Sequence, residues 1–338
     1  MLADGYLDGV RTLGPDEVDR WACAGYGRGG IAYTLLKAGT LRADRELVRA
    51  AMRWAAAGIR SGRRSHKRGW PRSSFSLGLT GLHALHALAA RAAGDEATCR
   101  RELGRFVASA RRARGSSIEL FQGMAGRLAG AAIVMRGLPD PGVRALGDAL
   151  AARILDRLEG DGASLAPKGL AHGYPGVVLG LLAWQAVARS LPEDALARAV
   201  AAAHPYDVSA LVPRRQVDWA HGHAGMALLF ARAFSVLGDR RFHAGARQAA
   251  ARARALPGGG LLLLDGAAGI AYGMLAVAAA DPAGPWRDAA WQIASHIFAR
   301  VEAPAANPFG LWGGLGGVCC LALDLLHETP AGFPGFEP

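Results

Sequence analysis

The sequence predicts an all-α protein whose helices form an (α/α)7 barrel, a toroid of seven helical hairpins. The pattern GxxG recurs seven times, and successive first glycines lie 44 to 51 residues apart. Each pattern opens an apolar run with helical spacing, and β-branched residues in strand-like alternation are few. The seven patterns are Gly27–Gly30, Gly78–Gly81, Gly123–Gly126, Gly173–Gly176, Gly222–Gly225, Gly266–Gly269 and Gly314–Gly317.

Each repeat is expected to contain one inner and one outer helix. The run after each GxxG is apolar on most sides, which is typical of a buried helix. A more charged, one-faced run such as residues 44–61 then follows and is expected to lie outside it. No linker or charge run divides the repeats, so we expect residues 1–338 to form a single domain with a closed ring. Inner helices are expected to include residues 31–38, 82–93, 177–190, 226–238 and 270–280.

The glycines place the start of every inner helix at a common mouth of the barrel. Free N–H groups and positive helix ends converge there, which favours an anion such as a thiolate or an enolate. The residue before each first glycine is expected to face the cavity. His172, His221 and Asp265 are the titratable members from three consecutive repeats, although they could instead only cap helices. The seven residues at this position are Tyr26, Leu77, Gln122, His172, His221, Asp265 and Gly313.

Other polar and aromatic residues lie within a few positions of a mouth glycine. The polar candidates are Glu119, Asp218, His223 and Arg215. Each of them also fits the role of a cap, a salt-bridge partner or a solvated loop residue. The tryptophans near these loops suit core packing as well as substrate stacking; they are Trp21, Trp70, Trp219 and Trp312.

Composition argues against several classes of protein. No apolar run is long enough to span a membrane, and the N-terminus lacks a secretory signal. Four cysteines without metal or disulfide spacing are typical of the cytoplasm, where we expect the protein. The net charge of +11 is concentrated partly in residues 60–72 and 111–115. It indicates either solvated loops or a docking surface for an acidic or phosphorylated partner. No nucleic-acid-binding motif is present.

Four motifs in the second half of the chain resemble the lanthipeptide cyclase (LanC-like) family. They correspond to the fourth to seventh repeat motifs of that family's seven-hairpin barrel. The resemblance implies an enzyme that adds a cysteine thiol of a dehydrated precursor peptide to a dehydroamino acid, which forms a thioether ring. It also implies possible partner dehydratase, kinase or lyase proteins. The motifs are GLAHGYPG (169–176), DWAHGHAG (218–225), LLLLDGAAGIAYG (261–273) and GLWGGLGGV (310–318).

The resemblance breaks down at the zinc site of the family. There, a cysteine of the fifth motif and an adjacent Cys-His of the sixth bind zinc, whereas this chain has Ala220, Leu264 and Asp265 at those positions. Alanine and leucine cannot ligate a metal, so we expect no zinc in the usual place and no cofactor. A different ion held by His172, His221 and Asp265 remains an alternative.

The rest of the match implies that the family's proton machinery is retained. His172 matches the histidine of the fourth motif, Glu119 stands where the third motif has an aspartate, and His221 replaces a tyrosine. The arginine of the fifth motif is replaced by Gln216, with Arg215 beside it.

We therefore expect a zinc-independent cyclase in which His172 and His221 act as base and acid. A free thiol has a pKa of about 8.5, so a base is needed to form the thiolate. A histidinium can then protonate the α-carbon, with Asp265 fixing the tautomer of one imidazole. Two other classes remain open: a non-catalytic scaffold that binds a precursor peptide or a partner enzyme, and another α/α-barrel enzyme such as a glycosidase or terpenoid cyclase.

Overall fold

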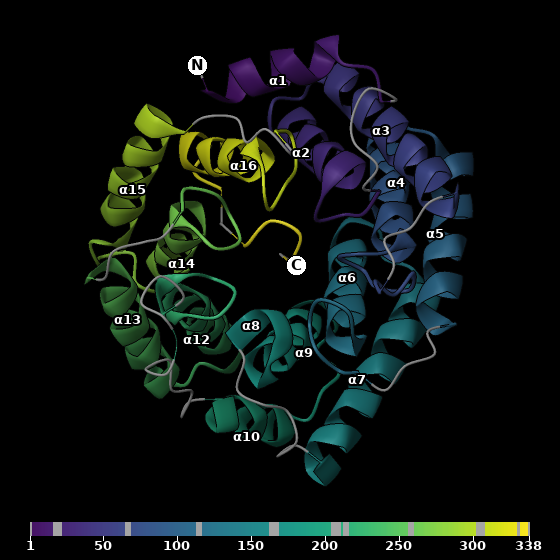
Figure 1. The fold of residues 1–338 in the computed structure, drawn as a ribbon. Helices are drawn as coiled ribbons and strands as arrows, with labels where there is room; N and C mark the ends of the chain where they lie inside the picture. The colour runs from purple at the N-terminus through teal and green to yellow at the C-terminus, as the bar shows by residue number, and fades with distance from the viewer. Residues whose placement is uncertain are drawn as a thin grey trace.

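A computed structural model describes residues 2–15, 22–64, 69–112, 117–161, 169–203, 211, 216–255, 260–301, 308–329 and 332–336. Its helices form two concentric rings, which confirms the predicted all-α toroid (Figure 1). The inner ring contains α2 (Gly27–Leu41), α4 (Leu79–Ala93), α6 (Met124–Gly137), α9 (Tyr174–Ala188), α12 (His223–Leu237), α14 (Ala267–Ala280) and α16 (Leu315–Leu326). The outer ring contains α1 (Leu2–Thr12), α3 (Arg45–Arg64), α5 (Glu96–Arg111), α7 (Pro141–Asp161), α10 (Glu193–Ala203), α13 (Arg240–Ala255) and α15 (Trp286–Arg300), and a short α8 (Gly169–His172) precedes α9.

Burial separates the two rings as the sequence pattern predicts. Every residue of α9 from Pro175 to Gln185 is buried, because neighbours surround this helix on all sides. The outer helix α3 buries one face, which includes Leu47 and Trp54, and its arginines lie mainly on the other face. Within the described ranges, no helix combines the length and the apolarity needed to cross a membrane.

The two ends of the chain together complete the seventh hairpin. In the other repeats the outer helix follows its inner helix, but α16 is covered by α1 from the start of the chain (Figure 1). The hydroxyl of Tyr6 on α1 donates to the carbonyl of Phe309, 2.9 Å away, and Leu7 and Val10 pack in one apolar cluster with Leu323. The ring is therefore closed by contacts between residues some 300 positions apart.

The second glycine of each motif is required by crowding. A Cβ at this position would overlap the carbonyl oxygen of the residue six positions earlier in all seven repeats, from Gly81 over Phe75 to Gly317 over Leu311. In the first repeat the overlap occurs at Gly29, over Cys23, and Tyr26 is the N-cap of α2. The first motif assigned from the sequence, Gly27–Gly30, is thus one residue out of register. Gly25, and not Tyr26, precedes the N-cap there.

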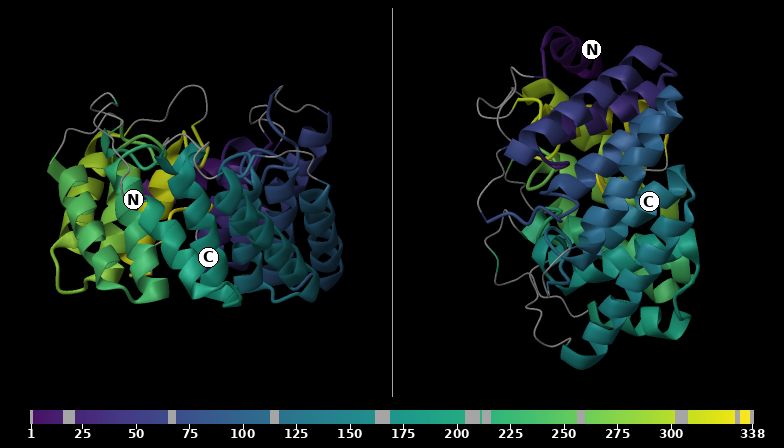
Figure 2. Two further views of the ribbon diagram at one scale, coloured as in Figure 1. Left: turned by 90° about the horizontal axis from the view of Figure 1, so that it is seen from below. Right: turned by 90° about the vertical axis from the view of Figure 1, so that its right-hand side faces the viewer.

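Among the described residues, backbone hydrogen bonds join five of the seven neighbouring pairs of motif loops at the mouth. The N–H groups of Gly25, Phe121, Ala171, Leu264 and Trp312 each donate to a carbonyl of the next loop around the ring. The Trp312 N–H reaches the Gly25 carbonyl at 3.1 Å, so the last motif loop is joined directly to the first. The loops lie at one end of the barrel (Figure 2). Side chains on neighbouring loops are therefore held in fixed relative positions.

A buried carboxylate ties the closing helix to its neighbours, and its removal should destabilise the ring. Asp324 of α16 is 1% exposed; it accepts a hydrogen bond from the Tyr272 hydroxyl at 2.6 Å and pairs with Lys37 at 3.0 Å. We expect Asp324→Ala to lower the free energy of unfolding by about 3–5 kcal/mol, because Lys37 keeps its charge in a mostly buried position. Urea unfolding measures this change. The control Asp8→Ala removes an exposed carboxylate and should cost less than about 0.5 kcal/mol; an equal loss in both variants would contradict the assignment.

Candidate functional site

Two histidines of the mouth each contact a buried carboxylate. His172 ends the short helix α8, and its Nδ1 lies 2.8 Å from Oε2 of Glu119 on the preceding motif loop. His221 lies on the next loop, where its Nδ1 is 3.4 Å from Oδ2 of Asp218. The two loops touch, since a Cβ on Gly169, which has a positive φ of 72°, would overlap the backbone of His221. Four of the sequence-predicted site residues are thus brought together on three consecutive loops.

Glu119 is held in place by the backbone of its own loop. Its carboxylate accepts hydrogen bonds from the N–H groups of Phe121, at 3.2 Å, and Gln122. The residue is 8% exposed, and the His172 ring is its third hydrogen-bond partner. A carboxylate that accepts from Nδ1 places the imidazole proton there and leaves Nε2 as the acceptor. Because the His172 side chain is 43% exposed, it is open to solvent at the mouth.

His221 and Asp218 form a second, more enclosed pair. Asp218 is 2% exposed and also accepts the backbone N–H of His221 at 2.6 Å, so this carboxylate shapes the turn as well. The His221 side chain is 25% exposed. The longer contact and lower exposure distinguish this pair from His172 and Glu119.

The remaining sequence candidates lie elsewhere. Asp265 is exposed, and its charge acts on Tyr26, whose pKa is raised to about 12 chiefly by burial and secondarily by Cys23 and Asp265. The imidazoles of His172 and His221 contact the carboxylates of Glu119 and Asp218, and the expected role of Asp265 in fixing a tautomer stays a prediction. His223 begins α12, where burial and then Arg252 of the outer helix α13 lower its pKa. Arg215 and Trp21 lie outside the described residues.

A stack of aromatic rings lies beneath the loops, and sequence reasoning missed three of them: Phe121, Phe333 and Phe336. Phe121 contacts the His172 ring edge-on, with centroids 5.3 Å apart, and stacks on Trp312 at 4.8 Å. Trp219 stacks on Phe333 at 3.8 Å. The C-terminal segment 332–336 contributes Phe333 and Phe336, and two phenylalanines spaced by Pro-Gly beyond the last helix were the only sequence signal for it. Trp219 and Trp312 are therefore core residues, whereas Trp70 lies beside Tyr26.

Comparison with known proteins decides the family. A family model described as "Lanthionine synthetase C-like protein" matches residues 25–337. The chain belongs to the lanthionine synthetase C-like family. Among solved structures, one titled "Nisin cyclase" aligns with a TM-score of 0.70 over 97% of this chain and 93% of that chain, at 13% sequence identity. At that identity the likeness supports the toroid fold alone.

The residues of this lanthionine synthetase C-like chain do not fit the zinc site that the family resemblance implies. Ala220 and Leu264 offer no donor atom, and Ala220 is buried with its carbonyl engaged by the Ala171 N–H at 3.0 Å. Trp219 Nε1 beside it has no acceptor among the described residues, but an indole N–H donates and cannot ligate a cation. Within the described ranges no three His, Cys, Asp or Glu side chains are grouped to hold a metal ion. This includes the set His172, His221 and Asp265.

Proposed function

We propose that this protein is a thioether-forming cyclase that acts without zinc on dehydrated peptides. One observation carries the proposal: the half-exposed His172 ring is oriented by the buried Glu119 carboxylate at the mouth of the barrel. The family membership of the chain supports a cyclase, and the side chains at positions 220 and 264 argue against the metal.

His172 is the group to which we assign both proton transfers. Its Nε2 takes the proton of a peptide cysteine thiol, and the thiolate sulfur bonds to the β-carbon of a dehydroalanine. The π electrons move toward the amide oxygen, which gives an enolate, and the histidinium returns the same proton to the α-carbon. The inner helices begin at these loops, and their positive N-terminal ends stabilise the negative charges of the thiolate and the enolate.

The proposal is tested with a synthetic peptide that contains one dehydroalanine and one cysteine. Iodoacetamide alkylates the free thiol and adds mass, whereas the cyclised peptide resists alkylation. At neutral pH we expect thiol loss about 10²-fold faster with the protein than in buffer alone. Thiols that remain alkylatable at the buffer rate would contradict cyclase activity, provided that a second peptide with different spacing behaves alike.

A non-catalytic scaffold is the second candidate, and the side chains of Ala220 and Leu264 favour it. A scaffold would bind the peptide and leave the thiol free. Fluorescence anisotropy of a labelled peptide, measured alongside the alkylation assay, separates the two functions: binding without reaction supports the scaffold, and reaction rules it out.

A further inference from the structure

The C-terminal segment 332–336 lies on the axis of the barrel. This segment lies at the centre of the ring, inside the inner helices (Figure 1). Phe333 and Phe336 are 1% and 3% exposed, so both rings are buried among the inner elements. Trp312 Nε1 donates to the carbonyl of Pro334 at 3.3 Å and fixes the backbone between them.

Phe336 contacts aromatic rings from three motif loops at once. Its centroid lies 5.5 Å from both Trp219 and Trp312 and 5.7 Å from Phe121, with interplanar angles of 13° to 18°. Such offset stacks add about 0.5–1.5 kcal/mol per pair beyond the apolar area that they bury. The phenyl ring of Phe336 therefore packs against all three loops.

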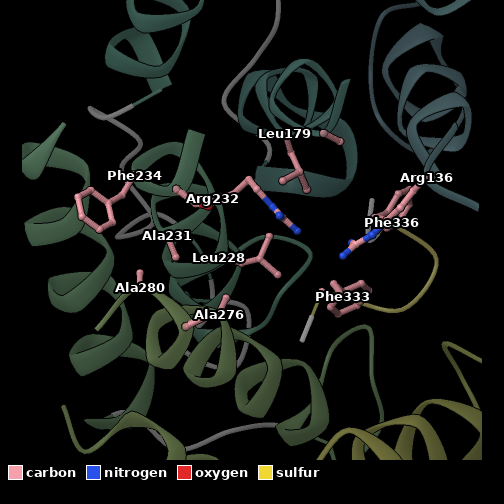
Figure 3. A pocket seen from close by; sticks show the side chains of 14 residues that line it. Arg136, Leu179, Leu228, Ala231, Arg232, Phe234, Ala276, Ala280, Phe333 and Phe336 are labelled. Carbon is pink, nitrogen blue, oxygen red and sulfur yellow. The ribbon is translucent and has the colours of Figure 1, made fainter. Parts of the chain in front are cut away.

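On its other side, the same segment borders a cavity. Phe333 and Phe336 line a space of 280 Å³ together with the middle and C-terminal parts of α9, α12 and α14 (Figure 3). Arg136 and Arg232 extend into this space from α6 and α12. Phe336 therefore lies between the aromatic rings of the motif loops and this cavity.

Phe121 connects the segment to the His172 site. Its ring packs edge-on against His172, and its backbone N–H donates to the Glu119 carboxylate. A displacement of Phe121 therefore moves both partners of the histidine–carboxylate pair. Phe336 supports the Phe121 ring together with Trp312, which stacks on it at 4.8 Å.

We propose that Phe336 is a positioning residue, and that segment 332–336 is the floor of the His172 site and closes the barrel axis behind it. The expected change in kcat rests on the proposed cyclase function, whereas the expected change in the position of the His172 ring does not. In this proposal the peptide enters and leaves at the motif loops, and the segment keeps water from reaching the enolate along the axis from the opposite end of the barrel.

The test compares two buried phenylalanines with equal exposure. Phe336→Ala removes the floor ring, and Phe242→Ala removes a ring that is also 3% exposed but stacks on Phe230 between α12 and α13. The first readout is the imidazole signal of His172 in protein with ¹³C-labelled histidine. Among ten histidines, this signal is identified by its absence from the His172→Ala spectrum. The second readout is kcat and KM for the dehydroalanine peptide.

We expect Phe336→Ala to move the His172 signal and to lower kcat about tenfold with little change in KM, because the pair loses its alignment. Phe336→Leu fills the volume without a flat ring, so it should move the signal in the same direction by less, and it tests the same contact if the alanine variant does not fold. Phe242→Ala should lower Tm and leave the His172 signal in place. An unmoved signal in both Phe336 variants, or an equal shift in Phe242→Ala, would overturn the proposal. A moved signal in a protein whose wild type does not cyclise peptides would uphold the floor and refute only the function.

Discussion

His172→Ala is expected to reduce the rate of thioether formation by about 10²–10⁴-fold, the range that one general acid–base group contributes. The ring is half exposed at the mouth, so its loss should leave the fold and peptide binding intact. We therefore expect kcat to fall and KM to change little, as measured by alkylation of the remaining thiol over time.

Two other histidine variants serve as a negative control and as a comparison for this prediction. His327→Ala removes an exposed imidazole at the C-terminal end of α16, the end opposite its motif loop, and should retain full activity. His221→Ala breaks the contact with Asp218 and is expected to have a smaller effect than His172→Ala, because that ring is more enclosed. Equal rates in wild type and His172→Ala would show that another group moves the proton.

Glu119→Gln should lower kcat by about 10²-fold or more, because an amide cannot replace the carboxylate in this setting. Oε2 accepts from both the Phe121 N–H and His172 Nδ1, and Oε1 accepts from the Gln122 N–H. A glutamine must turn its NH₂ toward one of these donors. If it faces His172, it donates to Nδ1 and drives the ring proton to Nε2, where it blocks the base.

Glu119→Asp is the matched variant for this prediction. It keeps both acceptor oxygens on a shorter side chain, so activity should recover in part relative to Glu119→Gln. The measurement is kcat for the same peptide, together with thermal unfolding to exclude loss of the fold. If Glu119→Gln were as active as wild type, Glu119 would have only a structural role, in holding the backbone of its own loop.

The fold could be predicted from the sequence because it rests on a repeated steric requirement. The crowded glycines of successive repeats lie 44 to 52 residues apart, and this period is recognisable even where the exact ends of single helices are uncertain. The register of the first motif could not be predicted in this way, because GRGG contains three glycines and either of the last two could be the crowded one. Only the position of the Cys23 carbonyl selects Gly29.

The site was predicted less completely, because its contacts have no sequence spacing. His172 was chosen by its place before a motif glycine, but Glu119 lies 53 residues away and became its partner through the ring geometry. Asp218 lies three residues before His221, so this partner is close in sequence, but spacing alone does not distinguish it from the other polar residues near the motif glycines. Phe336 follows no periodic pattern, so its position on the axis appears only when the ring is closed.

The measurement that tests the central claim most directly is the zinc content of a preparation that is forming thioethers. Metal analysis of purified, active protein should give far less than one zinc per chain, and turnover of the dehydroalanine peptide should be unchanged after treatment with a chelator. This result follows because Ala220 and Leu264 carry no donor atoms. One zinc per chain, with activity lost on chelation and restored by added zinc, would contradict the account.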